Sequence, residues 1–300
     1  MSSIMRTIAA FVTVVSFSCL SVSCKPKELN LFDSPAEVFI VADGFRFAEG
    51  PAVNSKGDLY FSDIPNNKAY KWTAEGGLEV VRDNTAGGNG LYISRNDELF
   101  TCETKSRQIT RMKNNGVIDI VTNEYEGRKY NKPNDLWIHP DGGVYFTDPS
   151  YYMKEEDVEQ DAEAVYLIPA GGGSVCRVTG HMTRPNGIVG TADGQTLYVV
   201  SDTVHQTWKY RINEDGSLDQ KELFVENGHD GLTLDEGGNL YIANRDNLSV
   251  DIYDPQGRFL DSIIFPEPPS NVCFAGKKRN ILFVTAVTSV YGVKMNVSGQ

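Results

Sequence analysis

The sequence predicts an all-β protein, a six-bladed β-propeller, and two observations carry that prediction. The chain of 300 residues contains 28 Gly, 14 Tyr and 14 Phe, and such a composition favours short strands joined by turns. An apolar, strand-like segment also recurs at intervals close to the roughly 40–45 residues of a four-stranded propeller blade. Its copies are residues 59–63, 99–103, 144–148, 197–202, 240–244 and 282–286.

The N-terminal residues 1–24 are typical of an export signal. Arg6 precedes an apolar stretch at 8–17, and small residues at 21–23 stand before Cys24. Cleavage after the small residues and lipidation of Cys24, as in bacterial lipoproteins, are both compatible with this pattern. We therefore expect an exported protein, periplasmic or secreted, with a lipid anchor if Cys24 is modified. The apolar stretch is too short for a membrane span.

After a short linker at 25–35, residues 36–300 are expected to form a single propeller domain. Residues 38–41 are strand-like but precede the first repeat, and one strand-like stretch, 290–295, follows the last repeat. An N-terminal strand that completes the last blade would close the ring and remove an open sheet edge. The polar, acidic insertion at 153–164 is expected to be a solvated loop or short helix.

Three cysteines, Cys102, Cys176 and Cys273, lie in the body of the chain. Their odd number and wide spacing argue against a disulfide framework. Because each stands among apolar residues, we expect three buried thiols on strands.

A polar side chain precedes each repeat by ten or eleven residues. These residues are Glu49, Asn89, Asn134, Asn186, Asp230 and Asn271. Equivalent positions of a repeat occupy equivalent places around a propeller axis. If they lie on the innermost strands, six oxygen-bearing side chains meet at one level of the central channel. A turn is the ordinary explanation for any single Asn-Gly pair, but six polar residues in register favour a binding site.

Two carboxylates, Glu49 and Asp230, belong to this predicted ring. Carboxylates that converge need a compensating cation, because like charges held together are costly. The oxygen-only set favours Ca²⁺ or Mg²⁺ over a structural Zn²⁺. Ca²⁺ is the expected ion because it tolerates the irregular geometry of ligands from separate blades.

The segments 47–51, 132–135, 145–149, 184–187 and 229–231 resemble the gluconolactonase/regucalcin family, also called senescence-marker-like proteins. The resemblance extends over residues 36–296. It implies a six-bladed propeller with one catalytic divalent cation, usually Ca²⁺, although Mg²⁺ or Zn²⁺ can take its place. By the same resemblance, the metal ligands are Glu49, Asn134, Asn186 and Asp230, and Asp230 is also the general base. Asn134 leans towards the substrate in some members.

The expected reaction is hydrolysis of a sugar lactone such as glucono-1,5-lactone. The cation would polarise the ring carbonyl while Asp230 takes a proton from the attacking water. Lys132 stands where some family members carry a substrate-contacting Arg, and Asn89 belongs to the ring, so both are candidate substrate contacts. Strand alternation turns His229 away from the channel, which favours a structural role. The acids that end the repeated strands, such as Asp63 and Asp202, are expected to hydrogen-bond turns.

Two alternatives remain. The same metal site could act on a non-sugar lactone or an organophosphate ester, because a cation polarises P=O as well as C=O. The chain could also be a non-enzymatic propeller with a structural ion. With 28 Lys and Arg against 40 Asp and Glu, the net charge of -12 argues against a nucleic-acid partner. A small molecule is the expected partner of a monomer or small homo-oligomer.

Overall fold

The computed structural model describes residues 30–300. The predicted export signal at 1–24, with Cys24, lies outside the described residues, as do linker residues 25–29. Among the residues described, none of the helices has the length and apolar character needed to cross a membrane.

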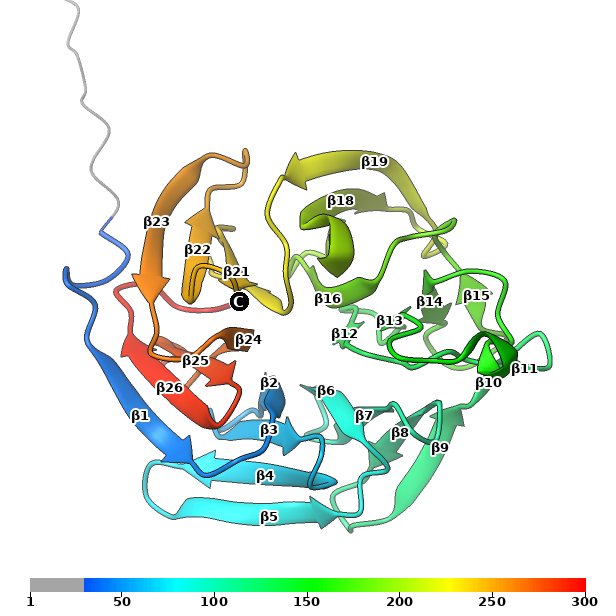
Figure 1. Ribbon diagram of the computed structural model, residues 1–300, viewed down its shortest axis with the longest axis horizontal. Helices are drawn as coiled ribbons and strands as arrows, with labels where there is room; N and C mark the ends of the chain where they lie inside the picture. The colour runs from blue at the N-terminus through cyan, green and yellow to red at the C-terminus, as the bar shows by residue number, and fades with distance from the viewer. Residues whose placement is uncertain (1–29) are drawn as a thin grey trace, which may run out of the picture. The chain divides into compact units, whose positions relative to one another are not determined.

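Six four-stranded antiparallel sheets surround a central channel (Figure 1). Each sheet begins at the channel and ends at the rim. Blade 1 consists of β2 (Ala48–Val53), β3 (Leu59–Asp63), β4 (Lys68–Thr73) and β5 (Gly77–Asp83); blade 2 of β6 (Gly88–Ile93), β7 (Leu99–Glu103), β8 (Gln108–Met112) and β9 (Ile118–Thr122); blade 3 of β12 (Leu136–Ile138), β13 (Val144–Asp148), β14 (Ala164–Ile168) and β15 (Cys176–Arg177).

The second half of the chain repeats this arrangement. Blade 4 consists of β16 (Pro185–Gly190), β17 (Thr196–Ser201), β18 (Gln206–Ile212) and β19 (Leu218–Val225); blade 5 of β20 (Leu232–Leu234), β21 (Leu240–Asn244), β22 (Ser249–Tyr253) and β23 (Phe259–Ile264); blade 6 of β24 (Pro269–Ala275), β25 (Ile281–Ala286), β26 (Ser289–Lys294) and β1 (Val38–Asp43). The six-bladed fold is therefore confirmed, and the repeated segment of the sequence is the second strand of each blade.

The N-terminal strand closes the ring, as the sequence predicts. β1 pairs antiparallel with β26, from Val38 opposite Val293 to Asp43 opposite Ser289. Blade 6 thus contains strands from both ends of the described chain, and β1 is its outermost strand, which covers the outer edge of β26.

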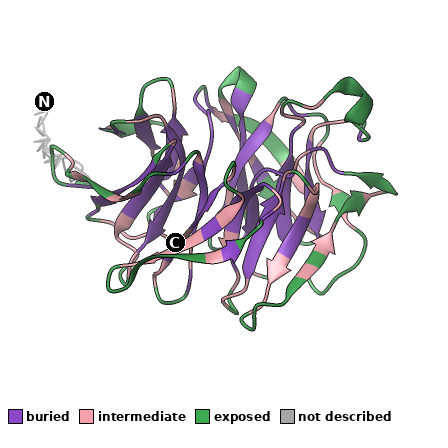
Figure 2. Cartoon of the chain, turned by 60° about the horizontal axis from the view of Figure 1, so that its bottom comes forward, coloured by how far each residue is buried: buried purple, intermediate pink, exposed green. Residues whose placement is uncertain are grey.

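The hydrophobic core lies between neighbouring blades rather than at the channel. The buried apolar side chains form six clusters within residues 31–300, one at each interface between blades. At the interface of blades 5 and 6, for example, Tyr241 packs edge-to-face on Phe274 with ring centroids 5.1 Å apart. Figure 2 shows buried residues along the inner strands and exposed ones at the connecting loops.

One feature differs from the prediction and another adds to it. Cys102 and Cys273 are buried, but Cys176 is exposed, so the expectation of three buried thiols is wrong at this position. Cys176 begins β15, an outermost strand, where one edge faces solvent. A short hairpin that the sequence analysis did not predict, β10 (Glu124–Tyr125) with β11 (Arg128–Lys129), follows blade 2.

The insertion at 153–164 packs against that hairpin. It contains one turn of 3₁₀ helix, η1 (Glu155–Asp157), with no buried residue, in agreement with the expected solvated loop or short helix. Gln160 Nε2 then donates to the carbonyl oxygens of Arg128 and Lys129, at 2.9 and 3.1 Å. A second 3₁₀ turn, η2 (Asp202–Val204), follows β17.

Glycines beside the ring residues let the inner strands approach one another. A Cβ atom at Gly50 would lie 2.2 Å from the carbonyl oxygen of Asn89, and one at Gly231 would lie 1.8 Å from Asn271 Oδ1. Such distances are far below van der Waals contact. Glycine is therefore required at 50 and 231 by the close approach of the neighbouring blade.

We predict that Gly231→Ala destabilises the protein by about 1–3 kcal/mol, the usual cost of overpacking a well-packed interior. The introduced methyl group would collide with Asn271 of the neighbouring inner strand. Chemical denaturation with fluorescence detection measures the change. The matched control is Gly180→Ala, because a Cβ atom at Gly180 meets nothing within 4 Å; equal stability of the two variants would contradict the packing argument.

Candidate active site

The structure places the six predicted ring residues at equivalent points of the six blades. Glu49, Asn89, Asn186 and Asn271 lie on the innermost strands β2, β6, β16 and β24. Asn134 and Asp230 stand two residues before β12 and β20. All six are buried, with 4–9% of their surface exposed. β-Bulges at the ring position in β2, β6 and β16 bend these strands and re-aim the side chains.

Hydroxyl groups of neighbouring blades hold this part of the inner strands. Ser62 Oγ donates to the carbonyl oxygen of Asn89 at 2.8 Å, and Thr147 Oγ1 to that of Asn186 at 2.7 Å. Ser270 Oγ donates to the carbonyl oxygen of Ala48 at 2.7 Å and so joins blade 6 to blade 1. Backbone positions at the ring are thus fixed by contacts between blades.

A third carboxyl group, Asp135, reaches the channel beside the ring. Asn271 Nδ2 lies 3.2 Å from Glu49 Oε2 and 3.4 Å from Asp135 Oδ2, so one amide contacts two acids. Glu49 Oε2 also accepts a hydrogen bond from the backbone of Gly50 at 2.7 Å. The sequence analysis missed Asp135, although it directly follows Asn134 in the quoted motif, because strand alternation assigns only one of two neighbours to a face.

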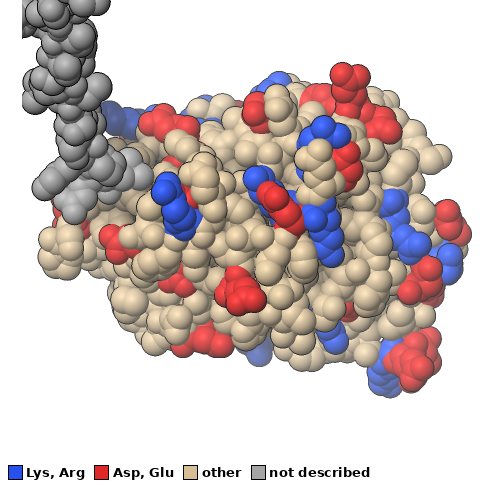
Figure 3. All heavy atoms as spheres, turned by 90° about the horizontal axis from the view of Figure 1, so that it is seen from above, with Lys and Arg blue, Asp and Glu red and all other residues tan. Residues whose placement is uncertain are grey.

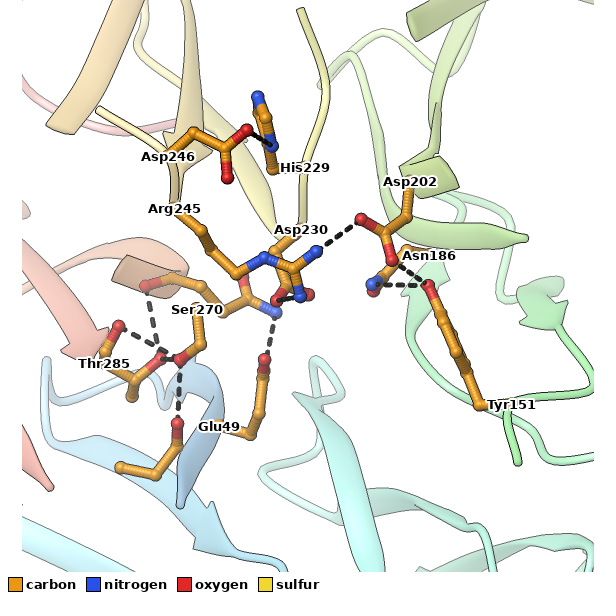
Figure 4. A network of polar contacts seen from close by, with 12 residues as sticks. Glu49, Tyr151, Asn186, Asp202, His229, Asp230, Arg245, Asp246, Ser270 and Thr285 are labelled. Carbon is orange, nitrogen blue, oxygen red and sulfur yellow. Dashed lines mark hydrogen bonds and ion pairs between the residues drawn. The ribbon is translucent and has the colours of Figure 1, made fainter. Parts of the chain in front are cut away.

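An arginine covers the ring on the side of blades 4 and 5. Arg245 follows β21, and its Nη1 lies 3.4 Å from Asp230 Oδ2 while its Nη2 lies 2.5 Å from Asp202 Oδ1. Asp202 Oδ2 accepts from the Tyr151 hydroxyl at 2.7 Å, and that hydroxyl accepts from Asn186 Nδ2 at 3.2 Å. Figure 4 shows Arg245 lying between Asp230 and Asp202, with Glu49 pointing towards Asp230.

Asp202 is thereby part of the site, which the repeat alone does not indicate. Asp63, at the equivalent strand end of blade 1, accepts from the backbone N–H groups of Arg46 and Phe47, at 3.2 Å each. That is the expected structural role. Asp202 instead contacts the side chains of Arg245 and Tyr151. These two residues lie in loops, and the repeat pattern does not predict where loop side chains extend.

Burial raises the pKa of all three channel carboxyl groups. The pKa of Glu49 rises to about 7, through desolvation and the nearby charge of Asp135, against the hydrogen bond from Gly50. Desolvation likewise raises the pKa of Asp135 to about 6. The pKa of Asp230 is well above its usual range because of burial and of Glu49, and Arg245 opposes this rise.

The ring is chemically suited to a hard divalent cation. Two carboxyl groups and two amide groups, from Glu49, Asp230, Asn134 and Asn186, supply only oxygen ligands, which Ca²⁺ and Mg²⁺ prefer. Raised pKa values mean that the buried carboxylates lack sufficient positive charge nearby, and a cation would supply it. The residues present therefore fit the ion that the resemblance implies.

The other predicted site residues, Asn89 of the ring, Lys132 and His229, have different surroundings. Asn89 is buried on β6, and Lys132 is half-buried, with desolvation lowering the pKa of its ammonium group. His229 faces away from the ring, with its Nδ1 3.9 Å from Asp246 Oδ2 (Figure 4). This orientation is the one that strand alternation predicts.

A cavity of about 820 Å³ occupies another stretch of the channel. It is lined by the C-terminal halves of the inner strands, by hairpin turns between first and second strands, and by Gly299 and Gln300. Asp135 and Asn271 line it, whereas Glu49, Asn186 and Asp230 do not. Asp135 and Asn271 thus separate this cavity from the candidate site.

Comparison with known proteins gives the family. Residues 47–288 match the model of the SMP-30/Gluconolactonase/LRE-like region. The chain belongs to this family. A gluconolactonase of Zymomonas mobilis is 28% identical over 310 aligned residues, which cover 91% of this chain and 85% of that protein.

Two further relatives match over most of their length, and one of them is a solved structure. A pentonolactonase of Haloferax volcanii is 26% identical, over 82% of this chain and 83% of that protein. The solved structure of a gluconolactonase from Xanthomonas campestris superposes with a TM-score of 0.81 at 29% identity, covering 87% of this chain and 90% of that one.

The raised pKa of Glu49 predicts how the metal-free protein responds to pH. A carboxyl group whose pKa is higher in the folded than in the unfolded state stabilises the fold at low pH, and that contribution is lost as pH rises from about 4.5 to about 7. Glu49→Gln removes the titration. In the presence of chelator, we therefore expect the Tm of the wild type minus the Tm of Glu49→Gln to decrease as pH rises from 5 to 8.

Differential scanning fluorimetry across this range measures the effect. Saturating Ca²⁺ should remove most of the decline, because the ion offsets the carboxylate charge. A Tm difference that is constant with pH in chelator would show that Glu49 titrates as an ordinary exposed acid.

Proposed function

We propose that the chain is a lactonase that hydrolyses a sugar lactone at the channel ring. The observation that carries the proposal is the closeness of two buried acids, Glu49 and Asp230, and of the Asn186 amide in the channel, in a chain whose relatives include a gluconolactonase and a pentonolactonase. Glu49, Asn134, Asn186 and Asp230 would hold one divalent cation, with Ca²⁺ as the preferred ion. When bound, the ion polarises the lactone carbonyl and offsets the charge that develops on its oxygen.

Asp230 is the proposed general base. Its carboxylate accepts a proton from the water that attacks the carbonyl carbon, and the same proton then goes to the departing ring oxygen. Arg245 contacts Oδ2 of this carboxylate and thereby fixes its orientation. Burial of Asp230 and the charge of Glu49 raise its pKa and favour proton uptake, whereas Arg245 opposes this rise, as a bound cation would.

Sugar recognition is assigned to polar groups around the ring. Lys132 carries a half-buried ammonium group that can donate to sugar hydroxyls, and Asn89 offers an amide on the neighbouring inner strand. Asn134 would hold the ion and also contact the substrate in this scheme. Lys and Arg are interspersed with Asp and Glu on the face that Figure 3 shows, which suits a small substrate better than a polyanion.

We also propose that the protein is exported, as a periplasmic, secreted or lipid-anchored enzyme. Support comes from the signal-like sequence of residues 1–24 alone.

Asp230→Asn is expected to lower kcat for glucono-1,5-lactone by at least about 100-fold, the usual contribution of a general base. The assay follows acid release above the spontaneous rate, with Ca²⁺, with chelator, and with Ca²⁺ restored. Activity should disappear with chelator and return with Ca²⁺. The control Asp157→Asn changes an exposed acid in the insertion and should retain wild-type rates.

Full activity in chelator would exclude the metal site as the catalytic centre. If the folded protein binds Ca²⁺ but does not hydrolyse the sugar lactone, the panel extends to non-sugar lactones and an organophosphate ester. Inactivity on the whole panel would leave the non-enzymatic propeller as the interpretation.

Lys132→Ala is expected to raise KM for the sugar lactone by about 10-fold and to change kcat little. The ammonium group contacts substrate hydroxyls in ground state and transition state alike, so its loss weakens binding uniformly. Steady-state kinetics separate the two parameters. Lys129→Ala, at an exposed position on β11, is the matched control; equal KM values for the two variants would remove Lys132 from the site.

A further inference from the structure

Three metal-ligating side chains gather outside the ring, in loops of blades 4 and 5 and of the segment that joins them. His205 follows η2 in the connection from β17 to β18, His229 precedes β20, and Asp246 lies between β21 and β22. Their ligand atoms all lie within 4.8 Å of one another. The two imidazole rings have centroids 4.0 Å apart and are inclined by 40°. Three separate loops therefore bring two imidazoles and one carboxylate to one point.

The spacing suits a shared ion better than direct hydrogen bonds. His229 Nδ1 lies 3.9 Å from Asp246 Oδ2, which is beyond hydrogen-bond distance. Two ligand atoms bound to one tetrahedral Zn²⁺ lie about 3.4 Å apart, given bond lengths near 2.1 Å. A shift of a few tenths of an ångström would thus bring His229 and Asp246 into a common coordination sphere.

His229 supplies a second, independent observation. Only 5% of its surface is exposed. Its Nδ1 atom is buried and has no hydrogen-bond partner among the described residues. Buried polar atoms in native proteins are nearly always satisfied, and an exception calls for an explanation such as an ion that completes the site. This nitrogen is directed towards Asp246 (Figure 4).

Arg245, a positively charged neighbour of the cluster, already forms ion pairs with other residues. Arg245 precedes Asp246 in the chain, but its guanidinium group contacts Asp202 and Asp230 on the channel side. In Figure 4 it lies apart from the pair formed by His229 and Asp246. The space between the two imidazoles and the Asp246 carboxylate is therefore not taken by Arg245.

We propose that His205, His229 and Asp246 form a second metal site, for a transition-metal ion of the Zn²⁺ type. Two imidazole nitrogens and one carboxylate oxygen suit Zn²⁺, whereas the oxygen-only ring suits Ca²⁺. Three protein ligands leave the fourth position to water or a small anion. The two sites thus select different ions, although Asp230 of the ring directly follows His229.

Such an ion would tie together the three loops that surround Asp230. His205 belongs to blade 4, Asp246 to blade 5, and His229 to the segment that joins the two blades. An ion bound to the folded protein alone stabilises it by mass action. Zn²⁺ is therefore expected to raise the Tm of the Ca²⁺-loaded protein.

The test uses Co²⁺ as a spectroscopic substitute for Zn²⁺, with the purified protein in saturating Ca²⁺. We expect one equivalent of Co²⁺ to bind with visible absorption bands typical of four- or five-coordination, and Zn²⁺ to remove these bands. His205→Gln and Asp246→Asn change exposed side chains, so both should fold. Each should weaken Co²⁺ binding by at least 10-fold, because even changes to the hydrogen-bond partners of metal ligands cost 10–100-fold.

The control variants His181→Gln and Asp157→Asn, also at exposed positions, should bind Co²⁺ as wild type does. The proposal is wrong if His205→Gln and Asp246→Asn retain the wild-type affinity and spectrum. It is equally wrong if Asp230→Asn abolishes the bands while His205→Gln keeps them, because the ion would then lie in the ring. Lactone hydrolysis is not a readout of this experiment, so its failure leaves the proposed function unaffected.

Discussion

The close approach of the six inner strands is the constraint on which the rest of the structure depends. Glycines allow one inner strand to pass within van der Waals contact of the next, and hydroxyl groups of Ser62, Thr147 and Ser270 hold the carbonyl groups there. Because the apolar core lies between blades, the same packing that stabilises the fold also sets the width of the channel. The polar ring is thus held by the whole propeller rather than by any local motif.

This rigidity has an electrostatic cost. Glu49, Asp135 and Asp230 are kept in a buried channel where desolvation opposes their ionised forms. Arg245 compensates Asp230 from one side only. The buried carboxyl groups destabilise the fold when no ion is bound. Glu49 and Asp230, which contribute to this cost, are also groups that would bind the ion. Ion binding and folding stability are therefore coupled.

The parts of the molecule that follow the repeat could be predicted from the sequence. The blade number, the closing strand β1 and the inner-strand positions of the ring all follow from spacing, because each blade is the same supersecondary unit. What the repeat leaves out could not be predicted in the same way. Arg245, Tyr151 and Asp202 meet through loops of different blades, and Asp135 enters the channel beside Asn134 although simple alternation allows only one of them. Cys176 is exposed because β15 is an outer strand. The apolar residues beside Cys176 in the sequence do not indicate whether its strand is an inner or an outer one.

The closure of blade 6 also has a consequence for how the chain reaches its native state. Val38 pairs with Val293, and Ser270 bonds to Ala48, so the seam joins segments from opposite ends of the domain. Contacts of such long sequence separation form slowly, because a large loop must close before they contribute. The ring therefore remains open until the C-terminal strands have been synthesised. A truncated product would leave β1 without β26, so completeness of the chain is a condition for the last blade and, through it, for a fully assembled channel.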